Sequence, residues 1–155
     1  MEIKRISANE TYAVRHPVLR PGRPIEDCSF EYDNHPLSIH LCVELDGKVI
    51  SVLSALPIQS SCFPELNAMR IRGIATLDPF QRLGYGSELM RYAEQELKNN
   101  RIELLWLNAR INASEFYSKL GYKPKGDLFN IDGIGIHQKF FKLLMGKKME
   151  VKKTV

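Results

Sequence analysis

The sequence predicts one mixed α/β domain, and three observations lead to that prediction. The chain has 155 residues, which is a typical length for a single domain. It is 44% hydrophobic and 26% charged, the composition of an ordinary globular protein. Segments with strand periodicity and segments with helical periodicity follow one another in the order β-α-β-β-β-α-β-α-β-β. That order favours a mixed sheet with helices over a regularly alternating doubly wound fold.

Periodicity and turn residues delimit the expected elements. Asn9 is the expected cap of the first helix, and Pro17 is expected to lie in the loop that follows it. Asp46-Gly47 predicts a tight hairpin between two strands of alternating polarity. Asn112 is the expected cap of the last helix, and Gly121 suits its C-terminal end. The elements are strand 2–6, a helix from Glu10, strands 38–45, 48–56 and 69–77, helix 87–98, strand 102–107, helix 113–120, and strands 123–129 and 134–143.

The chain's charge and cysteines narrow the functional classes. The net charge is +4 and the pI is about 9.0, with much of the surplus near the C-terminus. We expect a domain over 1–145 and a basic, frayed tail over 146–155. Three widely spaced cysteines indicate free thiols rather than disulfides or a zinc site. No apolar run is long enough to span a bilayer and no signal peptide is visible, so we expect a cytoplasmic protein without a membrane partner.

A glycine-rich turn between a strand and a helix is the most informative feature. It contains the residues Gln81, Arg82, Leu83, Gly84, Tyr85, Gly86 and Ser87. Such a turn presents free backbone N–H groups at a helix N-terminus, where the helix dipole also favours an anion. The turn lacks the Gly-Lys-Ser/Thr of a P-loop and the first glycine of a dinucleotide motif. Two readings remain open: a phosphate-bearing cofactor held by main chain, or a turn needed only for backbone geometry.

Two motifs resemble landmarks of the GCN5-related N-acetyltransferase (GNAT) superfamily. The run 72–87, Arg-Gly-Ile-Ala-Thr-Leu-Asp-Pro-Phe-Gln-Arg-Leu-Gly-Tyr-Gly-Ser, is similar to the acetyl-CoA signature. The run 113–122, Ala-Ser-Glu-Phe-Tyr-Ser-Lys-Leu-Gly-Tyr, is similar to a second landmark of the family. The resemblance covers most of the chain. It implies a mixed, mostly antiparallel central sheet flanked by helices, with a splayed strand pair that holds acetyl-CoA.

The resemblance also implies roles for individual residues. It implies that backbone groups of Ile74, Ala75 and Thr76 bind the pantetheine arm of the cofactor. The amides of residues 81–87 are then expected to hold the pyrophosphate, with Arg82 as a possible charged contact. Many relatives have an asparagine where this chain has Arg110, and the flanking Asn108 and Asn112 are the candidate substitutes.

The same resemblance suggests catalytic candidates. Tyr117 occupies the position of a tyrosine near the thioester sulfur, which would protonate the leaving thiolate. Taken alone, Tyr117 could equally pack as one aromatic of a helix. His137 fits loosely a histidine found near the C-terminus of a bacterial branch of the family, and it is a candidate base or substrate contact. A structural strand histidine is the other reading, and Glu44 or an ordered water could also be the base.

The predicted activity is transfer of an acetyl group from acetyl-CoA to a primary amine of a small molecule or protein. The amine would attack directly in a ternary complex, because no cysteine lies near either landmark. No metal site is expected, since the histidines lack metal-ligand spacing. A homodimer is possible. The alternatives are a non-catalytic CoA-binding domain, an enzyme for longer acyl chains, and, with less support, a basic nucleic-acid-binding module, which lacks any matching motif.

Overall fold

A computed structural model describes residues 1–144, and the predicted tail 146–155 lies outside them, as does the expected domain end at residue 145. The described residues form two compact units, 1–57 with 71–96, and 58–70 with 97–144. The hydrogen-bonded strand order is β1-β2-β3-β4-β5-β7-β6. This is the predicted mixed, mostly antiparallel α/β architecture: β1–β2, β2–β3, β5–β7 and β6–β7 pair antiparallel, and β4 pairs with β5 in parallel.

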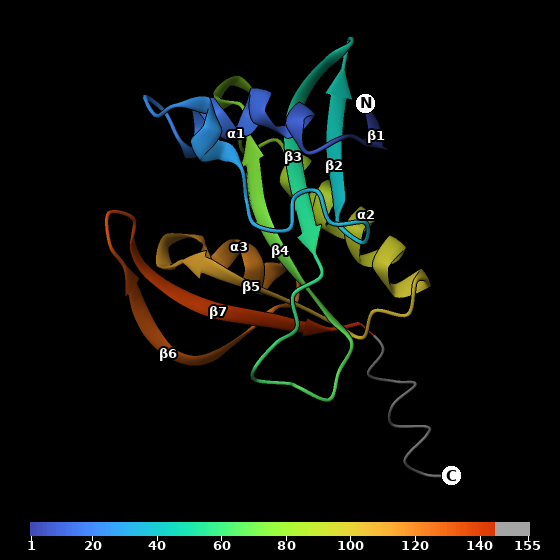
Figure 1. Ribbon diagram of the computed structural model, residues 1–155, viewed down its shortest axis with the longest axis vertical. Helices are drawn as coiled ribbons and strands as arrows, with labels where there is room; N and C mark the ends of the chain where they lie inside the picture. Colours follow the sequence, from blue (N-terminus) through green and yellow to red (C-terminus); the bar gives the residue numbers. More distant parts are fainter. Residues whose placement is uncertain (145–155) are drawn as a thin grey trace. The chain divides into compact units, whose positions relative to one another are not determined.

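The first unit contains the N-terminal strands and most of the longest helix (Figure 1). β2 and β3 form the predicted hairpin, and Asp46 and Gly47 have φ values of 49° and 79°, as a tight primed turn requires. Its elements are β1 (Glu2–Arg5), η1 (Asn9–Thr11), α1 (Tyr12–Leu19), η2 (Ile25–Cys28), β2 (Ile39–Leu45), β3 (Lys48–Leu56), most of β4 (Ala68–Thr76), η3 (Asp78–Phe80) and most of α2 (Tyr85–Asn99).

The start of the first helical segment differs from the prediction. Asn9 does not cap it: the backbone N–H of Glu10 donates to Ser7 Oγ, and a Glu10 carboxylate oxygen accepts from the Ser7 N–H. This reciprocal pair is a capping box, written in the sequence as Ser-x-x-Glu. Pro17 lies inside α1 rather than in the following loop. It is in the helix's second turn, where the missing N–H removes only one hydrogen bond of a short helix.

The core of the first unit is apolar and lies between α1 and the strands. Val14 of α1, Cys42 of β2, Val52 of β3 and Ala75 of β4 are buried together. Cys28 and Cys42 are buried free thiols, whereas Cys62 of the second unit is half-buried. Burial raises the pKa of both Cys28 and Cys42, so these thiols stay protonated and act as core residues.

The second unit contains the C-terminal strands, and β7 lies between β5 and β6 (Figure 1). The Gly121 prediction is confirmed: its φ is 93°, its N–H donates to Ser118 O, and the Tyr122 N–H donates to Tyr117 O. The predicted Asn112 cap is wrong, because Asn112 lies within η4 and no side chain caps α3. The elements are the first residues of β4 (68–70), β5 (Leu104–Arg110), η4 (Ile111–Ala113), α3 (Ser114–Lys119), β6 (Lys123–Ile131) and β7 (Gly135–Leu143).

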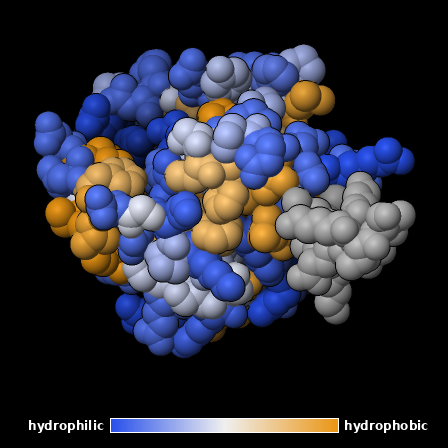
Figure 2. All heavy atoms as spheres, turned by 90° about the horizontal axis from the view of Figure 1, so that it is seen from below, coloured by the Kyte–Doolittle hydropathy of each residue, from blue (hydrophilic) through white to orange (hydrophobic). Residues whose placement is uncertain are grey.

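The core of the second unit combines aliphatic and aromatic residues. Trp106 packs with Leu66, Ala68 and Leu104, and Phe63 and Phe141 pack against that group. Exposed apolar side chains include Leu128, Ile134 and Ile136 of the β6–β7 segment. The face seen in Figure 2 shows its apolar residues in separate patches among polar ones. Within residues 1–144, no helix combines the length and hydrophobicity that a membrane span needs.

Candidate active site

The glycine-rich turn presents a row of unused backbone donors. Among residues 1–144, the N–H groups of residues 82–87 have no hydrogen-bond acceptor. The first bond of the helix is donated by the Glu88 N–H to Gly84 O, at 3.0 Å. Gly84 precedes α2 with φ 91°, and a Cβ built on it would meet no atom within 4 Å. Free amides at the N-terminus of a 15-residue helix, beside open space, fit the phosphates of a CoA-type cofactor.

Two residues of the turn have more specific places than the sequence indicated. The Gln81 side-chain amide donates to Thr76 O at 2.8 Å and to Asp78 Oδ1 at 3.0 Å. Gln81 therefore ties the turn to the end of β4. Arg82 has φ 63°, a left-handed conformation that is costly for a residue with a Cβ. Strain of this kind persists where the surrounding structure requires it.

The predicted pantetheine-binding positions lie at the end of β4. The parallel register of β4 with β5 comprises Ala68, Met69 and Arg70, so Ile74, Ala75 and Thr76 come after its last pair. The Ser51 hydroxyl contacts Ala75 O at 3.3 Å and Thr76 Oγ1 at 2.7 Å. The side of β4 that faces β3 is thus held by hydrogen bonds.

Tyr117 lies on α3 in an aromatic group of the second unit. The centre of its ring is 5.0 Å from the ring centre of Phe116, and 6.1 Å from the ring centres of Tyr122 and Phe140. Burial raises the pKa of Tyr117 to about 12. Its hydroxyl has no hydrogen-bond partner within the described residues. Tyr117 is therefore a neutral phenol at physiological pH, with a free O–H donor.

His137 lies on β7 with a defined tautomer. Its Nδ1 is 2.8 Å from Gly135 O, and a carbonyl oxygen only accepts hydrogen bonds, so Nδ1 bears the proton. The lone pair of the neutral ring is then on Nε2. The ring stacks on Phe129 with centroids 5.8 Å apart, and the residue is 6% exposed. Glu44, the other side-chain candidate for the base, is in an ion pair with Lys4 at 2.7 Å.

Asn108 and Asn112 differ in their surroundings. Asn108 lies on β5, and its Oδ1 is buried with no hydrogen-bond partner among residues 1–144. A buried acceptor without a donor is costly, so this oxygen fits a site that receives an N–H from a bound molecule. Asn112, in the middle of η4, and Arg110, at the end of β5, are both exposed.

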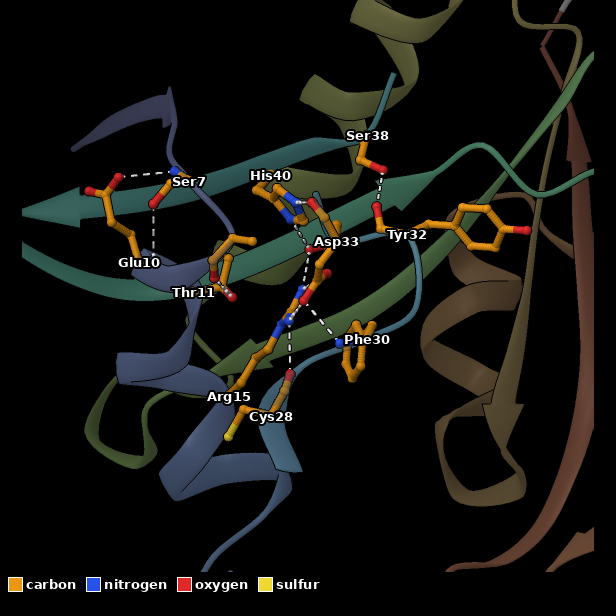
Figure 3. Close-up of polar contacts among 12 residues, drawn as sticks. Ser7, Glu10, Thr11, Arg15, Cys28, Phe30, Tyr32, Asp33, Ser38 and His40 are labelled. Carbon is orange, nitrogen blue, oxygen red and sulfur yellow. Dashed lines mark hydrogen bonds and ion pairs between the residues drawn. The ribbon is translucent and has the colours of Figure 1, made fainter. Parts of the chain in front are cut away.

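A buried polar network in the first unit was not predicted from the sequence (Figure 3). Arg15 of α1 is completely buried and donates to both oxygens of Asp33, at 2.7 and 3.1 Å. It also donates to Cys28 O at 2.9 Å and to Ser54 Oγ at 2.8 Å. Asp33 in turn accepts from the Phe30 N–H at 2.9 Å. The network therefore fixes the loop 28–33 to α1 and β3.

His40 completes this network through both ring nitrogens. Its Nε2 is 2.8 Å from Asp33 O, so Nε2 is protonated, and its Nδ1 is 2.7 Å from Ser54 Oγ. Ser54 Oγ accepts from Arg15 and is also the hydrogen-bond partner of His40 Nδ1. The Phe30 ring lies 3.9 Å from the Arg15 guanidinium carbon and 4.1 Å from that of Arg72. These residues are spread between Arg15 and Arg72 and form no motif, so the sequence carries no signal for them.

Comparisons with known proteins agree with the two motifs. The family model described as acetyltransferase (GNAT) family matches residues 6–122. An uncharacterized N-acetyltransferase of Bacillus subtilis (strain 168), YitI, is 40% identical over 144 residues, which are 93% of this chain and 97% of that protein.

Solved structures agree as well. An aminoglycoside 6'-N-acetyltransferase complexed with coenzyme A has a TM-score of 0.74 and 12% identity, covering 93% of this chain and 97% of its own. The ribosomal-protein-S18-alanine N-acetyltransferase from Escherichia coli has a TM-score of 0.71 and 16% identity, covering 92% and 93%. At these identities the two structures show a shared fold.

Proposed function

Because the chain belongs to the acetyltransferase (GNAT) family, we propose that it transfers an acetyl group from acetyl-CoA to a primary amine in a ternary complex. The observation that carries the proposal is the row of free amides over residues 82–87, ahead of α2. Acetyl-CoA supplies a thioester whose carbonyl carbon accepts the amine and whose sulfur leaves. The family model spans most of the chain, which supports 1–145 as one functional domain.

The turn and the end of β4 are the proposed cofactor-binding elements. The amides of residues 82–87 donate to the pyrophosphate, and Arg82 adds a positive charge near it. Gln81 contributes through its contacts with Thr76 and Asp78, which hold the turn in place. Backbone groups of Ile74, Ala75 and Thr76 bond the pantetheine amides, and Asn108 Oδ1 accepts one N–H. Asn112 stays a candidate for a further polar contact.

The proposed chemistry needs one proton acceptor and one hydrogen-bond donor. The amine nitrogen forms a bond to the acetyl carbon, and the carbon–sulfur bond breaks. His137 Nε2 takes the proton that the nitrogen loses, from the face of β7 opposite to the one where Phe140 packs against Tyr117. Tyr117 donates a hydrogen bond to the departing sulfur. Its pKa of about 12 exceeds that of a thiol, about 8.5, so the phenol stabilises the thiolate mainly as a donor, and solvent completes its protonation.

Isothermal titration calorimetry with acetyl-CoA tests the cofactor site. Gly84→Glu places a bulky anion beside the free amides and should abolish micromolar binding. Gly47→Glu is the matched control: Gly47 also has positive φ and open space around a built Cβ, but it lies in the β2–β3 hairpin. Both variants suffer the same left-handed strain, about 1–2 kcal/mol, so only a site effect separates them. Equal binding by the two variants would contradict the assignment.

A turnover assay separates the enzyme from a non-catalytic CoA-binding domain. Release of the CoA thiol is measured with a panel of primary amines, with Tyr117→Phe beside the wild type. We expect Tyr117→Phe to bind acetyl-CoA normally and to lose roughly tenfold or more in kcat, as expected for loss of a positioned donor. Tight binding with no turnover of any amine would favour the non-catalytic alternative.

A further inference from the structure

One face of the sheet in the second unit carries cations above aromatic rings. Arg70 of β4 is opposite Trp106 of β5, and Trp106 is opposite Phe141 of β7. Residues directly opposite one another in neighbouring strands project to the same face. In the next row Asn108 is opposite Lys139, which is opposite Lys125 of β6. Alternate residues of a strand also share a face, so these two rows form one surface.

The cations of this surface contact rings. The Arg70 guanidinium carbon and the Lys139 ammonium nitrogen are each 5.2 Å from the centre of the Trp106 ring. The two cations are therefore no farther apart than twice that distance. Lys125 Nζ is 5.6 Å from the centre of the Phe63 ring. Aromatic faces partly offset positive charge, but they do not satisfy directed N–H donors as oxygen acceptors do.

Within residues 1–144, these three cations have no carboxylate partner. Among the ion pairs of residues 1–144, none includes Arg70, Lys125 or Lys139. Arg70 Nε is buried and unbonded, although buried polar groups are nearly always paired. Lys125 and Lys139 face each other across the β6–β7 pair, where like charges destabilise a sheet. A group of positive charges without carboxylate partners is stabilised when an anion binds between them.

We infer that Arg70, Lys125 and Lys139 bind an anionic group, a carboxylate or a phosphate, carried by the amine that accepts the acetyl group. This inference rests on the proposed function, because it names the substrate class of the same site. Guanidinium and ammonium groups are the usual ligands of such anions. The proposed base His137 is two residues from Lys139 on the same face of β7, about 7 Å along the strand. The acceptor is therefore a compact molecule with an amine and an anion several bonds apart, such as a short ω-amino acid.

Anion binding can be measured without any turnover, because Trp106 is the only tryptophan of the chain. Its fluorescence is titrated with inorganic phosphate and with glutarate, at constant ionic strength set with chloride. The titration uses the Gly84→Glu background, so that phosphate at the glycine turn does not contribute. We expect a saturable change that weakens roughly 10- to 100-fold in Arg70→Gln and Lys139→Gln, the value of a charged hydrogen bond.

Control variants separate charge from packing. Lys119→Gln removes an exposed cation of α3 that is paired with Glu115, and it should bind anions like the parent protein. Arg70→Lys keeps the charge without the forked donors and should recover part of the affinity. The inference is wrong if the parent protein shows no saturable change, or if Arg70→Gln binds both anions as tightly as the parent.

A second arm links the anion to acetyl transfer. Wild-type enzyme is assayed with ω-amino acids of increasing length, and with the corresponding ω-amino amides, which keep the amine but replace the carboxylate with an uncharged carboxamide. The acids should be preferred roughly 10- to 100-fold in kcat/KM, and Arg70→Gln should remove that preference mainly through KM. Equal rates for acids and amides would refute the inference and leave the acetyltransferase proposal intact. Anion binding without acetylation of any amine would refute the acetyltransferase proposal and keep the anion site.

Discussion

Replacing Asp33 with asparagine tests the buried network of the first unit. Asp33 is the only carboxylate in an ion pair with Arg15 in the part of the chain that the structure describes. The side chains of Arg15 and Asp33 are 0% and 2% exposed. Asparagine preserves the size of the side chain and one accepting oxygen, but it leaves the guanidinium buried without a negative charge.

The expected cost follows from that geometry. Removing one partner of a buried ion pair costs about 3–5 kcal/mol, because the other charge is left uncompensated. The hydrogen bonds from Arg15 to Cys28 O and Ser54 Oγ remain, so we expect a loss at the lower end of this range, about 3 kcal/mol of the free energy of unfolding. For a chain of this size that corresponds to a fall of roughly 6–12 °C in Tm.

Urea unfolding followed by far-UV circular dichroism measures the change in free energy. Trp106 fluorescence, from the second unit, shows whether both units unfold together. Arg15→Met in the Asp33→Asn background removes the stranded cation, so the double variant should be no less stable than Asp33→Asn alone. A loss below about 1 kcal/mol in Asp33→Asn, or simple additivity of the two substitutions, would refute the reasoning.

Two further predictions concern a glycine and the tyrosine. Gly73→Ala should destabilise by about 2–4 kcal/mol, since its φ is 71° and a Cβ would lie 2.6 Å from Phe30 Cε2; Gly22→Ala, at φ 74° in open space, should show only the strain, and equal losses in thermal denaturation would exclude the clash. The pKa of Tyr117 is raised from 10 to about 12 in the folded protein, so burial of the neutral phenol contributes fully to the free energy of unfolding below pH 10, and this contribution is lost as pH rises to about 12. In Tyr117→Phe the free energy of unfolding should lack this alkaline fall; the same dependence of stability on pH in both proteins would contradict the prediction.

The fold was largely predictable from local signals. Asp46-Gly47 specified a hairpin because both residues need positive φ, and Gly121 specified a helix end for the same reason. Errors occurred where two local signals competed. Asparagine favours helix caps, which predicts Asn9, but Ser7 and Glu10 form the capping box. Proline usually ends a helix, but in α1 the one missing N–H of Pro17 is tolerated.

The candidate site was predictable only where its residues are contiguous. The turn around Gly84 and the segment around Tyr117 are motifs, so a single sequence reveals them. Arg15 and Asp33 are 18 residues apart and meet only through the packing of a loop on α1. The contact of Lys139 with the Trp106 ring depends on strand register, which periodicity does not define.

The division of the chain has a consequence for its synthesis. The first unit needs residues 71–96 in addition to 1–57, so it is completed only after residue 96 has left the ribosome. At about 5–20 residues per second, the 39 residues after position 57 take roughly 2–8 s to appear. During this interval the hairpin of β2 and β3 has its apolar face uncovered by β4 and α2. Nascent-chain capture by chaperones should therefore be strongest in this window and should end when α2 emerges.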